Sequence, residues 1–393
     1  MIDFTKKTAR TEPESHLGNL AKTIIAIREE EFQSLSFDSC RSWSLRIWKE
    51  TARELVEKSL CYNPTPVPLD IKIEATEKRD QYELKKVTFA TASHTRVPAF
   101  LLIPSQGKPP YPGIVALHDH GEFHYFGKEK IVSCPQEHKI LKSFREQYYG
   151  SRPYAEELAR RGYVVLVIDA FYWGERRLQF KAIPSELEEK LSGISPSSEQ
   201  YVIIWNDFYN DRVKSLNTML GFCGTTWLGI EVHDDRKSID VLQSIPEVDP
   251  ERIGAIGLSG GGYRTGYLAG MDDRIKVAVI VGWMTELVDL VKISEPVHYG
   301  RPIAEESVYK HLDHPDIVSL AAPECALNIF NCGQDQLYTF ASMKRACEKI
   351  GAVYKKLGAS SKFNYKFFDV PHLFNIEMQE ESFNWIDRWL KDS

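Results

Sequence analysis

Apolar positions in the first part of the chain follow the helical period. Two series recur at this spacing: Leu17, Leu20, Ile24 and Ile27, then Cys40, Trp43, Ile47 and Leu55. Asp38 and Ser39 precede the second series and are suitable helix caps. Three prolines within residues 63–68 then prevent a helix from continuing. We therefore predict a helical N-terminal extension over residues 1–68.

From residue 82 onward the apolar residues alternate or form short continuous runs, as they do in strands. The predicted strands are 82–90, 96–103, 112–118, 163–169, 252–258, 275–282, 326–331 and 363–368. Helical patterns occur at 154–162, 226–245, 340–357 and 384–390. The first two strands read as a hairpin, whereas strands that alternate with helices form a mainly parallel, doubly wound sheet. We predict an α/β fold over residues 69–393, with ligand chemistry at the carboxyl ends of the strands.

Two long segments interrupt this alternation. Residues 170–224 are rich in aromatic side chains, and residues 283–325 directly follow a predicted strand. Segments of this length at the active-site end of a sheet usually form lids or pocket walls. We predict that both cover the strand ends, while individual aromatic residues among them close a secondary core.

The composition narrows the kind of partner that the protein takes. The 393 residues carry a net charge of −6, which argues against nucleic acid or an anionic membrane as the main partner. Seven scattered cysteines without a C-x-x-C pair are expected to be reduced thiols. The first residues lack the apolar core of a signal peptide, and no window approaches 18 apolar residues. We expect a soluble, cytoplasmic protein, and the composition leaves a homo-oligomer open.

The most informative motif is Gly257-Leu-Ser-Gly-Gly261, between a predicted strand and a predicted helix. A G-x-S-x-G pattern in that context is typical of a nucleophile elbow, a sharp turn that exposes a serine. Gly257 and Gly261 remove Cβ atoms that would collide in such a turn, and Gly260 keeps its N–H free to donate. The simpler interpretation of Ser259 and its neighbours is a glycine-rich turn that ends a buried strand.

A serine hydroxyl becomes a good nucleophile only when an oriented base takes its proton. In doubly wound hydrolases the partners follow in the order serine, acid, histidine, each after a strand. Asp335 and His372 each follow one of the last two predicted strands. Asp369 and Asp316 are competing acids, but Asp335 has the better position at a strand end. We therefore predict a catalytic triad of Ser259, His372 and Asp335.

The predicted oxyanion hole has two backbone donors. One is the N–H of Gly260, directly after the nucleophile, and the other comes from the loop after the predicted strand 112–118. The spacing favours the N–H of His120, with Asp119 and Gly121 as alternatives.

The same loop allows a rival interpretation as a metal site. His118, His120 and His124 are suitable ligands, with Asp169 or Glu122 as a carboxylate partner. Because the loop lies where a hydrolase needs its backbone, and a serine triad needs no metal, we predict neither a metal nor another cofactor.

These motifs resemble the α/β-hydrolase superfamily, and within it the dienelactone hydrolase and acetyl xylan esterase-like branch. The resemblance rests on Leu117-His-Asp-His-Gly121, Ile168-Asp-Ala-Phe-Tyr-Trp-Gly-Glu-Arg176, the run from Asp234-Asp235 to Asp249-Pro-Glu-Arg-Ile-Gly254, Gly257-Leu-Ser-Gly-Gly-Gly262, Asp272-Asp-Arg-Ile275, Gly333-Gln-Asp335 and Pro371-His372. It covers residues 80–393 and implies the α/β-hydrolase fold and a serine hydrolase. Asp119 stands where such loops often carry glycine, and an acidic side chain there is expected to narrow the pocket or disfavour anionic substrates.

The expected activity is hydrolysis of a small carboxylic ester, of the acetyl-ester or carbohydrate-ester type, through an acyl-enzyme. The alternatives are a carbon–carbon bond hydrolase or a thioesterase on the same scaffold, and a catalytically silent binding protein. Candidate pocket residues are Asp119, Tyr172, Trp283 and Phe374. An enclosed pocket with aromatic walls favours short acyl groups.

Overall fold

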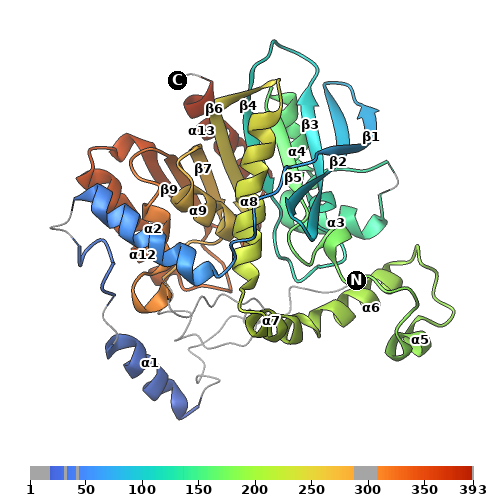
Figure 1. Cartoon of the computed structure of the whole chain (residues 1–393), viewed down its shortest axis with the longest axis horizontal. Coiled ribbons are helices and arrows are strands. Elements are labelled where there is room, and N and C mark those ends of the chain that lie inside the picture. Colours follow the sequence, from blue (N-terminus) through green and yellow to red (C-terminus); the bar gives the residue numbers. More distant parts are fainter. Residues whose placement is uncertain (1–17, 31–32, 41–43, 136, 287–307, 392–393) are drawn as a thin grey trace.

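The computed structural model describes residues 18–30, 33–40, 44–135, 137–286 and 308–391, and its strands form one sheet (Figure 1). The nine strands follow the order β1-β2-β3-β5-β4-β6-β7-β8-β9. They are β1 (Lys72–Lys78), β2 (Tyr82–Ala92), β3 (Thr95–Pro104), β4 (Tyr111–Leu117), β5 (Val164–Ile168), β6 (Val248–Leu258), β7 (Ile275–Val281), β8 (Ala326–Cys332) and β9 (Phe363–Phe368). The pairs β1–β2, β2–β3 and β3–β5 are antiparallel, and the other pairs are parallel. The predicted α/β fold with a mainly parallel sheet is confirmed.

Strand β1 was not predicted from the sequence pattern. Its side chains are almost all exposed, so no alternation of apolar and polar residues marks it. It is a strand because it pairs with β2, from Lys72 opposite Thr88 to Lys78 opposite Glu83. Backbone hydrogen bonds to a neighbouring strand therefore define this element, and burial does not.

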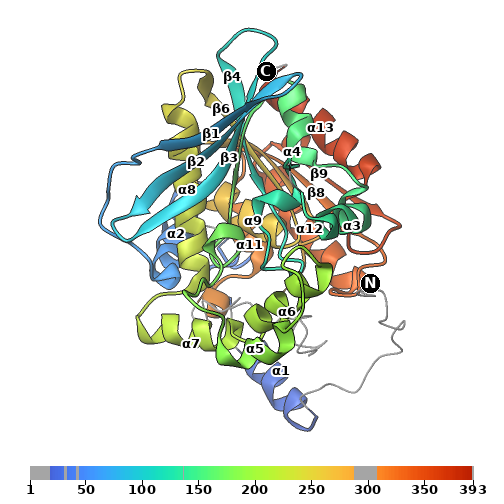
Figure 2. The same ribbon diagram turned by 90° about the vertical axis from the view of Figure 1, so that its right-hand side faces the viewer.

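Helices cover both faces of the sheet. They are α1 (Leu20–Glu30), α2 (Leu45–Leu60), α3 (Lys139–Tyr149), α4 (Tyr154–Arg160), α5 (Ser185–Leu191), α6 (Glu199–Asn210), α7 (Val213–Phe222), α8 (Trp227–Ser244), α9 (Gly260–Met271), α11 (His314–Ser319), α12 (Phe340–Lys356) and α13 (Ile376–Leu390). One core contains side chains of α2, α8, α9 and α12, and the core on the opposite face contains side chains of α3, α4 and α13 (Figure 2). The predicted helices at 154–162, 226–245 and 340–357 are confirmed as α4, α8 and α12, whereas α3 was not predicted.

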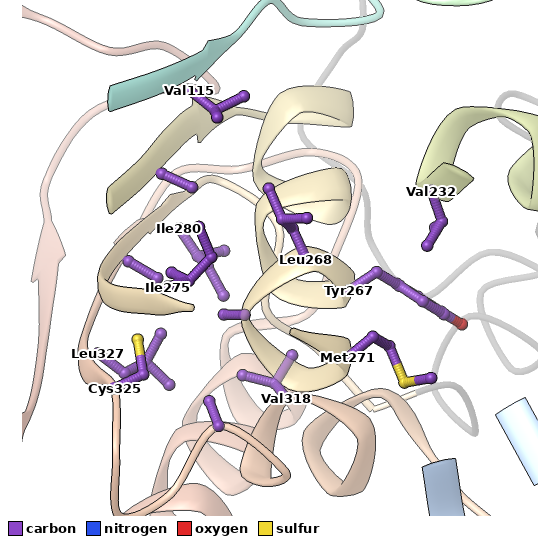
Figure 3. Close-up of a cluster of buried hydrophobic side chains, with 14 of the residues drawn as sticks. Val115, Val232, Tyr267, Leu268, Met271, Ile275, Ile280, Val318, Cys325 and Leu327 are labelled. Carbon is purple, nitrogen blue, oxygen red and sulfur yellow. The ribbon is translucent and has the colours of Figure 1, made fainter. Parts of the chain in front are cut away.

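Helix α9 lies at the centre of the first of these cores (Figure 3). Leu268 and Met271 on α9 pack with Ile280 of β7 and Leu327 of β8, and each is at most 5% exposed. Burial of one such side chain contributes about 1.5–3 kcal/mol. This packing holds α9 against the sheet, and α9 begins directly after Ser259.

Helix α2 confirms the helical prediction within residues 1–68, but its cap differs from the expected one. Ser44, and neither Asp38 nor Ser39, is the N-cap, and its hydroxyl accepts a hydrogen bond from the N–H of Ile47 at 3.3 Å. Trp43 and Leu17 lie outside the described residues. The division of the chain at residue 68 remains a prediction.

The inner face of α2 is fixed to the α/β core. Trp48, Ala52 and Val56 are at most 1% exposed. The Lys49 ammonium donates to the carbonyl of Ala322 at 3.0 Å, and the Arg53 guanidinium donates to the carbonyl of Gly270 at 2.8 Å. These contacts join the N-terminal segment to the end of α9 and to the chain before β8.

Within residues 170–224, helices α5, α6 and α7 lie at the end of the sheet from which α8 begins (Figures 1 and 2). Most aromatic residues of this segment form a third core with one another and with α8: Tyr172, Trp173, Trp205, Phe208, Tyr209 and Trp227. Part of the second predicted cover, residues 287–307, falls outside the described residues. The lid role of both segments remains a prediction.

The cysteines and helices agree with the expectations from composition. All seven cysteines lie in the described ranges and are free thiols. Within those ranges, no helix combines the length and the apolar character needed to cross a bilayer.

Candidate active site

Ser259 occupies a sharp turn between β6 and α9. Its backbone angles are φ 54° and ψ −117°, a conformation that a residue with a side chain rarely adopts. The Ser259 N–H donates to the carbonyl of Val281, the last residue of β7, at 2.8 Å. The serine is partly exposed, whereas Leu258 and Gly260 on either side are buried. The predicted elbow geometry is therefore present.

The glycines around Ser259 are required by close backbone contacts. A Cβ atom at position 257 would lie 2.4 Å from the carbonyl carbon of Gly261, and one at position 261 would lie 2.1 Å from the carbonyl oxygen of Leu117. Both distances are far below any allowed contact. The predicted collisions are confirmed, and the second one shows that the turn lies directly against the carboxyl end of β4.

Asp335 and His372 come together from the ends of β8 and β9. The His372 Nδ1 lies 2.7 Å from the Asp335 Oδ2, and the Asp335 side chain is fully buried. Because a carboxylate only accepts hydrogen bonds, Nδ1 carries the proton. The second Asp335 oxygen accepts from the N–H of Leu337 at 2.8 Å, which fixes the carboxylate.

The two competing acids have other partners. Asp369 accepts a hydrogen bond from the Gln334 side chain at 3.0 Å. Asp316 is buried, pairs with Lys349 at 2.7 Å and accepts from the N–H of Phe37 at 3.1 Å. The structure thus pairs His372 with Asp335 alone among the three predicted acids.

His372 and Ser259 both lie against the end of β7. A Cβ atom at Gly282 would lie 3.2 Å from Cε1 of His372, so the imidazole packs on the residue after Val281. Val281 is the residue that holds the Ser259 N–H. Among the described residues, the buried His372 Nε2 has no hydrogen-bond partner. The imidazole therefore has one nitrogen without a hydrogen-bond partner among those residues, at the strand end that also holds Ser259.

The pKa of His372 is raised above its ordinary value. Burial alone lowers it, because it disfavours the charged imidazolium. The charge of the Asp335 carboxylate and its hydrogen bond outweigh burial, and the charge of Asp119 acts in the same direction. The surroundings therefore favour the protonated imidazole, which is the form that a general base takes once it has accepted a proton.

The predicted oxyanion donors lie at the first residue of α9 and in residues 118–121. Gly260 is the first residue of α9, where helix N–H groups have no acceptor within their own helix. The carbonyl of His120 accepts from the Trp173 indole at 3.2 Å. The His118 Nδ1 donates to the carbonyl of Asp119 at 2.8 Å, and its Nε2 accepts from the N–H of Ala170 at 3.1 Å.

This arrangement does not support the three-histidine metal site. Both ring nitrogens of His118 are engaged in the loop. Within the described part of the chain, the one group with metal-ligand spacing is Glu129, Asp169 and Glu175. The Lys128 ammonium lies among these carboxylates, 2.6 to 3.1 Å from each. A buried lysine thus takes the position of a cation there.

Two of the four candidate pocket residues have side chains that are buried among partners in the core, and their place in a pocket remains a prediction. Asp119 is 3% exposed, and its carboxylate accepts from the Tyr149 hydroxyl at 2.5 Å within the core. Phe374 is fully buried, with its ring 5.3 Å from that of Tyr154. The hydrogen bond from Tyr149 and the charge of Lys130 hold the Asp119 carboxylate inside the core.

The other two candidates are also largely buried. The Tyr172 hydroxyl donates to the carbonyl of Tyr209 at 3.0 Å inside the core of the 170–224 segment. Trp283 follows Gly282, and its ring lies 4.6 Å from that of Tyr263. Trp283 directly follows Gly282, which packs against His372, and so lies nearest in sequence to the site. Its role in a pocket remains a prediction.

A cavity of about 370 Å³ lies elsewhere, between the β1–β2 turn and α4. Its lining includes Glu77, Arg79, Tyr82, Ser133 and Glu156, and none of the three predicted triad residues. Arg79 is paired there with Glu77 and Glu156, so its charge is already compensated.

Comparisons with known proteins agree with this fold. No protein-family model matches the sequence. The chain is 24% identical over 327 residues to YtaP of Bacillus subtilis (strain 168), provisionally named a hydrolase, with 83% of this chain and 95% of YtaP covered.

Two solved structures show the same architecture. A protein of Bacteroides fragilis NCTC 9343, provisionally named an acetyl xylan esterase, superposes with a TM-score of 0.68 at 17% identity over 92% of this chain and 85% of its own. A glucuronoyl esterase from Solibacter usitatus gives a TM-score of 0.59 at 14% identity over 90% and 93%. The chain has the α/β-hydrolase fold, as its resemblance in sequence implied.

Proposed function

We propose that this protein is a serine hydrolase that cleaves small carboxylic esters through an acyl-enzyme. The carrying observation is the His372 imidazole, bound by Asp335 at 2.7 Å on one nitrogen and buried without a partner on the other, beside the strained Ser259. The esterase names of the two structural neighbours favour an ester over other acyl compounds.

The proposed reaction uses each of these groups in turn. His372 Nε2 accepts the proton of the Ser259 hydroxyl as the oxygen bonds to the ester carbonyl carbon. The N–H of Gly260 and an N–H of the loop 118–121 hold the oxyanion. The intermediate collapses, and His372 gives its proton to the departing alcohol. Water, deprotonated by His372, then attacks the acyl-enzyme and restores Ser259. Asp335 keeps His372 oriented and stabilises its charged form.

We expect short acyl groups to react best, with acetyl first. The aromatic core of the 170–224 segment lies at the sheet end that carries the site, which favours a small enclosed pocket over an open groove. The measurement is kcat/KM for one chromogenic alcohol with acyl chains from two to about ten carbons. A steady rise toward long chains would contradict the lid prediction. If no ester reacts while Ser259 is still labelled by a fluorophosphonate, the carbon–carbon hydrolase or thioesterase becomes the better assignment.

The pH dependence follows from the raised pKa of His372. The proposed base works only when Nε2 is unprotonated, so kcat/KM falls as the pH drops through this pKa. We expect one acid limb whose midpoint lies above about 6.5, the ordinary histidine value. A kcat/KM profile from pH 5 to 9 on an acetyl ester measures it. An acid limb centred below the ordinary value would contradict the pairing with Asp335.

A further inference from the structure

Two fully buried lysines lie at the ends of one short turn, η1 (Lys128–Lys130), beside the loop 118–121. A lysine is almost never fully buried unless its ammonium is paired. The partners of the two differ in kind. Lys128 binds the carboxylates of Glu129, Asp169 and Glu175. Lys130 binds the backbone of the loop that carries the predicted oxyanion donor.

The contacts of Lys130 are with two consecutive peptide carbonyls. Its ammonium lies 3.1 Å from the carbonyl oxygen of Asp119 and 2.9 Å from that of His120. It also lies 3.3 Å from the Asp119 carboxylate. The rings of Phe144 and Phe123 lie on the ammonium at 5.1 and 5.9 Å, so the charge acts in apolar surroundings.

The directions of these two carbonyls determine the directions of the N–H groups of His120 and Gly121, which are candidate oxyanion donors. In a trans peptide unit the N–H points opposite to the carbonyl of the preceding residue. The carbonyl of Asp119 faces Lys130 and the His118 Nδ1, so the N–H of His120 points away from both. The carbonyl of His120 faces Lys130 and the Trp173 indole. The N–H of Gly121, in the same peptide unit, therefore points away from both. A cation on the carbonyl also polarises the N–H of the same unit.

We propose that Lys130 is a positioning residue for the oxyanion hole. Its ammonium holds the peptide units 119–120 and 120–121 with their N–H groups toward Ser259 and strengthens these groups as donors. The inference rests on the proposed function. It assigns to the buried Lys130 side chain an effect on the stability of the transition state without contact with the substrate.

The test compares two matched lysines. In Lys130→Met, the carbonyls lose their cation, and we expect kcat on an acetyl ester to fall about 10- to 100-fold, since loss of a whole oxyanion donor costs about 10² to 10³. KM should change less than about threefold, because the ground-state ester depends little on this donor. Lys128 is equally buried but has no bond to the loop carbonyls. In Lys128→Met, kcat calculated for the folded fraction of the protein should therefore stay within a few-fold of the wild-type value, even if the melting temperature falls.

A double variant separates the backbone effect from charge balance. Lys130→Met leaves the Asp119 carboxylate without its cation, and Lys130→Met with Asp119→Asn removes both charges. The double variant should fold better and still show the loss in kcat. It also serves if the single variant does not fold. A return of kcat to the wild-type value in the double variant would overturn the positioning role, as would an unchanged kcat in Lys130→Met.

The rate of fluorophosphonate labelling gives a second readout that needs no ester. The phosphonyl oxygen also develops charge in the oxyanion hole, so labelling of Lys130→Met should slow by a similar factor. Labelling at the wild-type rate would contradict the inference and leave the proposed function intact. If the wild-type protein neither hydrolyses esters nor reacts with the probe, the proposed function itself is wrong, and the role of Lys130 is withdrawn with it.

Discussion

Replacing Ser259 with alanine will remove essentially all ester hydrolysis, a loss on the order of 10⁶ in kcat when a serine nucleophile is deleted. The reason is that Ser259 alone holds the strained turn beside the unpaired nitrogen of His372. Alanine keeps a Cβ atom in the same backbone conformation, so the fold is expected to persist. Initial rates on an acetyl ester, with a melting curve for each protein, give the result.

Chemical labelling makes this result specific. A fluorophosphonate should form one adduct, located on Ser259 by mass spectrometry, and no adduct in Ser259→Ala. Ser238→Ala is a matched control, because Ser238 is buried on α8 and donates to the carbonyl of Asp234 at 3.0 Å, away from the elbow. Labelling at another serine, or full activity in Ser259→Ala, would show that the nucleophile lies elsewhere.

Replacing Asp335 with asparagine should lower kcat by about 10⁴, the loss known for the orienting acid of a serine triad. The Asp335 carboxylate accepts the Nδ1 proton at 2.7 Å, and an amide can present its NH₂ group and favour the wrong tautomer. The measurement is kcat and KM on an acetyl ester at a pH above the acid limb.

Asp369→Asn is the control for this prediction. Asp369 accepts from Gln334 near the same strand ends, whereas the His372 Nδ1 is bound to Asp335, so the loss in Asp369→Asn should stay within a few-fold. The reverse pattern, with a large loss for Asp369 and a small one for Asp335, would exchange their roles. Equal small losses would remove an acid partner from the mechanism.

The parts of the site that follow from local sequence were predictable. The elbow depends on a few adjacent residues, and the contacts of Gly257 and Gly261 leave no room for a Cβ atom. Asp335 and His372 could be placed because parallel strands bring their carboxyl ends to one edge. Periodicity identified most strands and several helices with a buried face, but α3, which also has one, was missed. It failed for β1, which has no buried face.

The direction of single side chains was not predictable. Asp119 was correctly placed in the loop after β4, but its carboxylate turns inward toward Tyr149, 30 residues later in the chain. The loop support from Lys130 and Trp173 was missed for the same reason, since each contact depends on how a later part of the chain, 10 or 53 residues beyond His120, packs against the loop.

The cap of α2 gives a third example. Asp38, Ser39 and Ser44 are all suitable capping residues. Leu35 donates its N–H to the carbonyl of His311, which joins the segment before Asp38 to a part of the chain almost 280 residues away. Such tertiary contacts hold the earlier residues outside the helix and leave the cap to Ser44.

The docking of α2 has a consequence for the order in which the chain is made and folded. Its Arg53 binds the carbonyl of Gly270, 217 residues later, and its Lys49 binds that of Ala322, 273 residues later. At about 5 to 20 residues per second on the ribosome, these partners emerge on the order of 10 to 50 seconds after the helix. The apolar face of Trp48, Ala52 and Val56 thus waits without its partner surface. This helix is therefore synthesised well before the surfaces that it packs on, and its apolar face stays available to other chains during that interval.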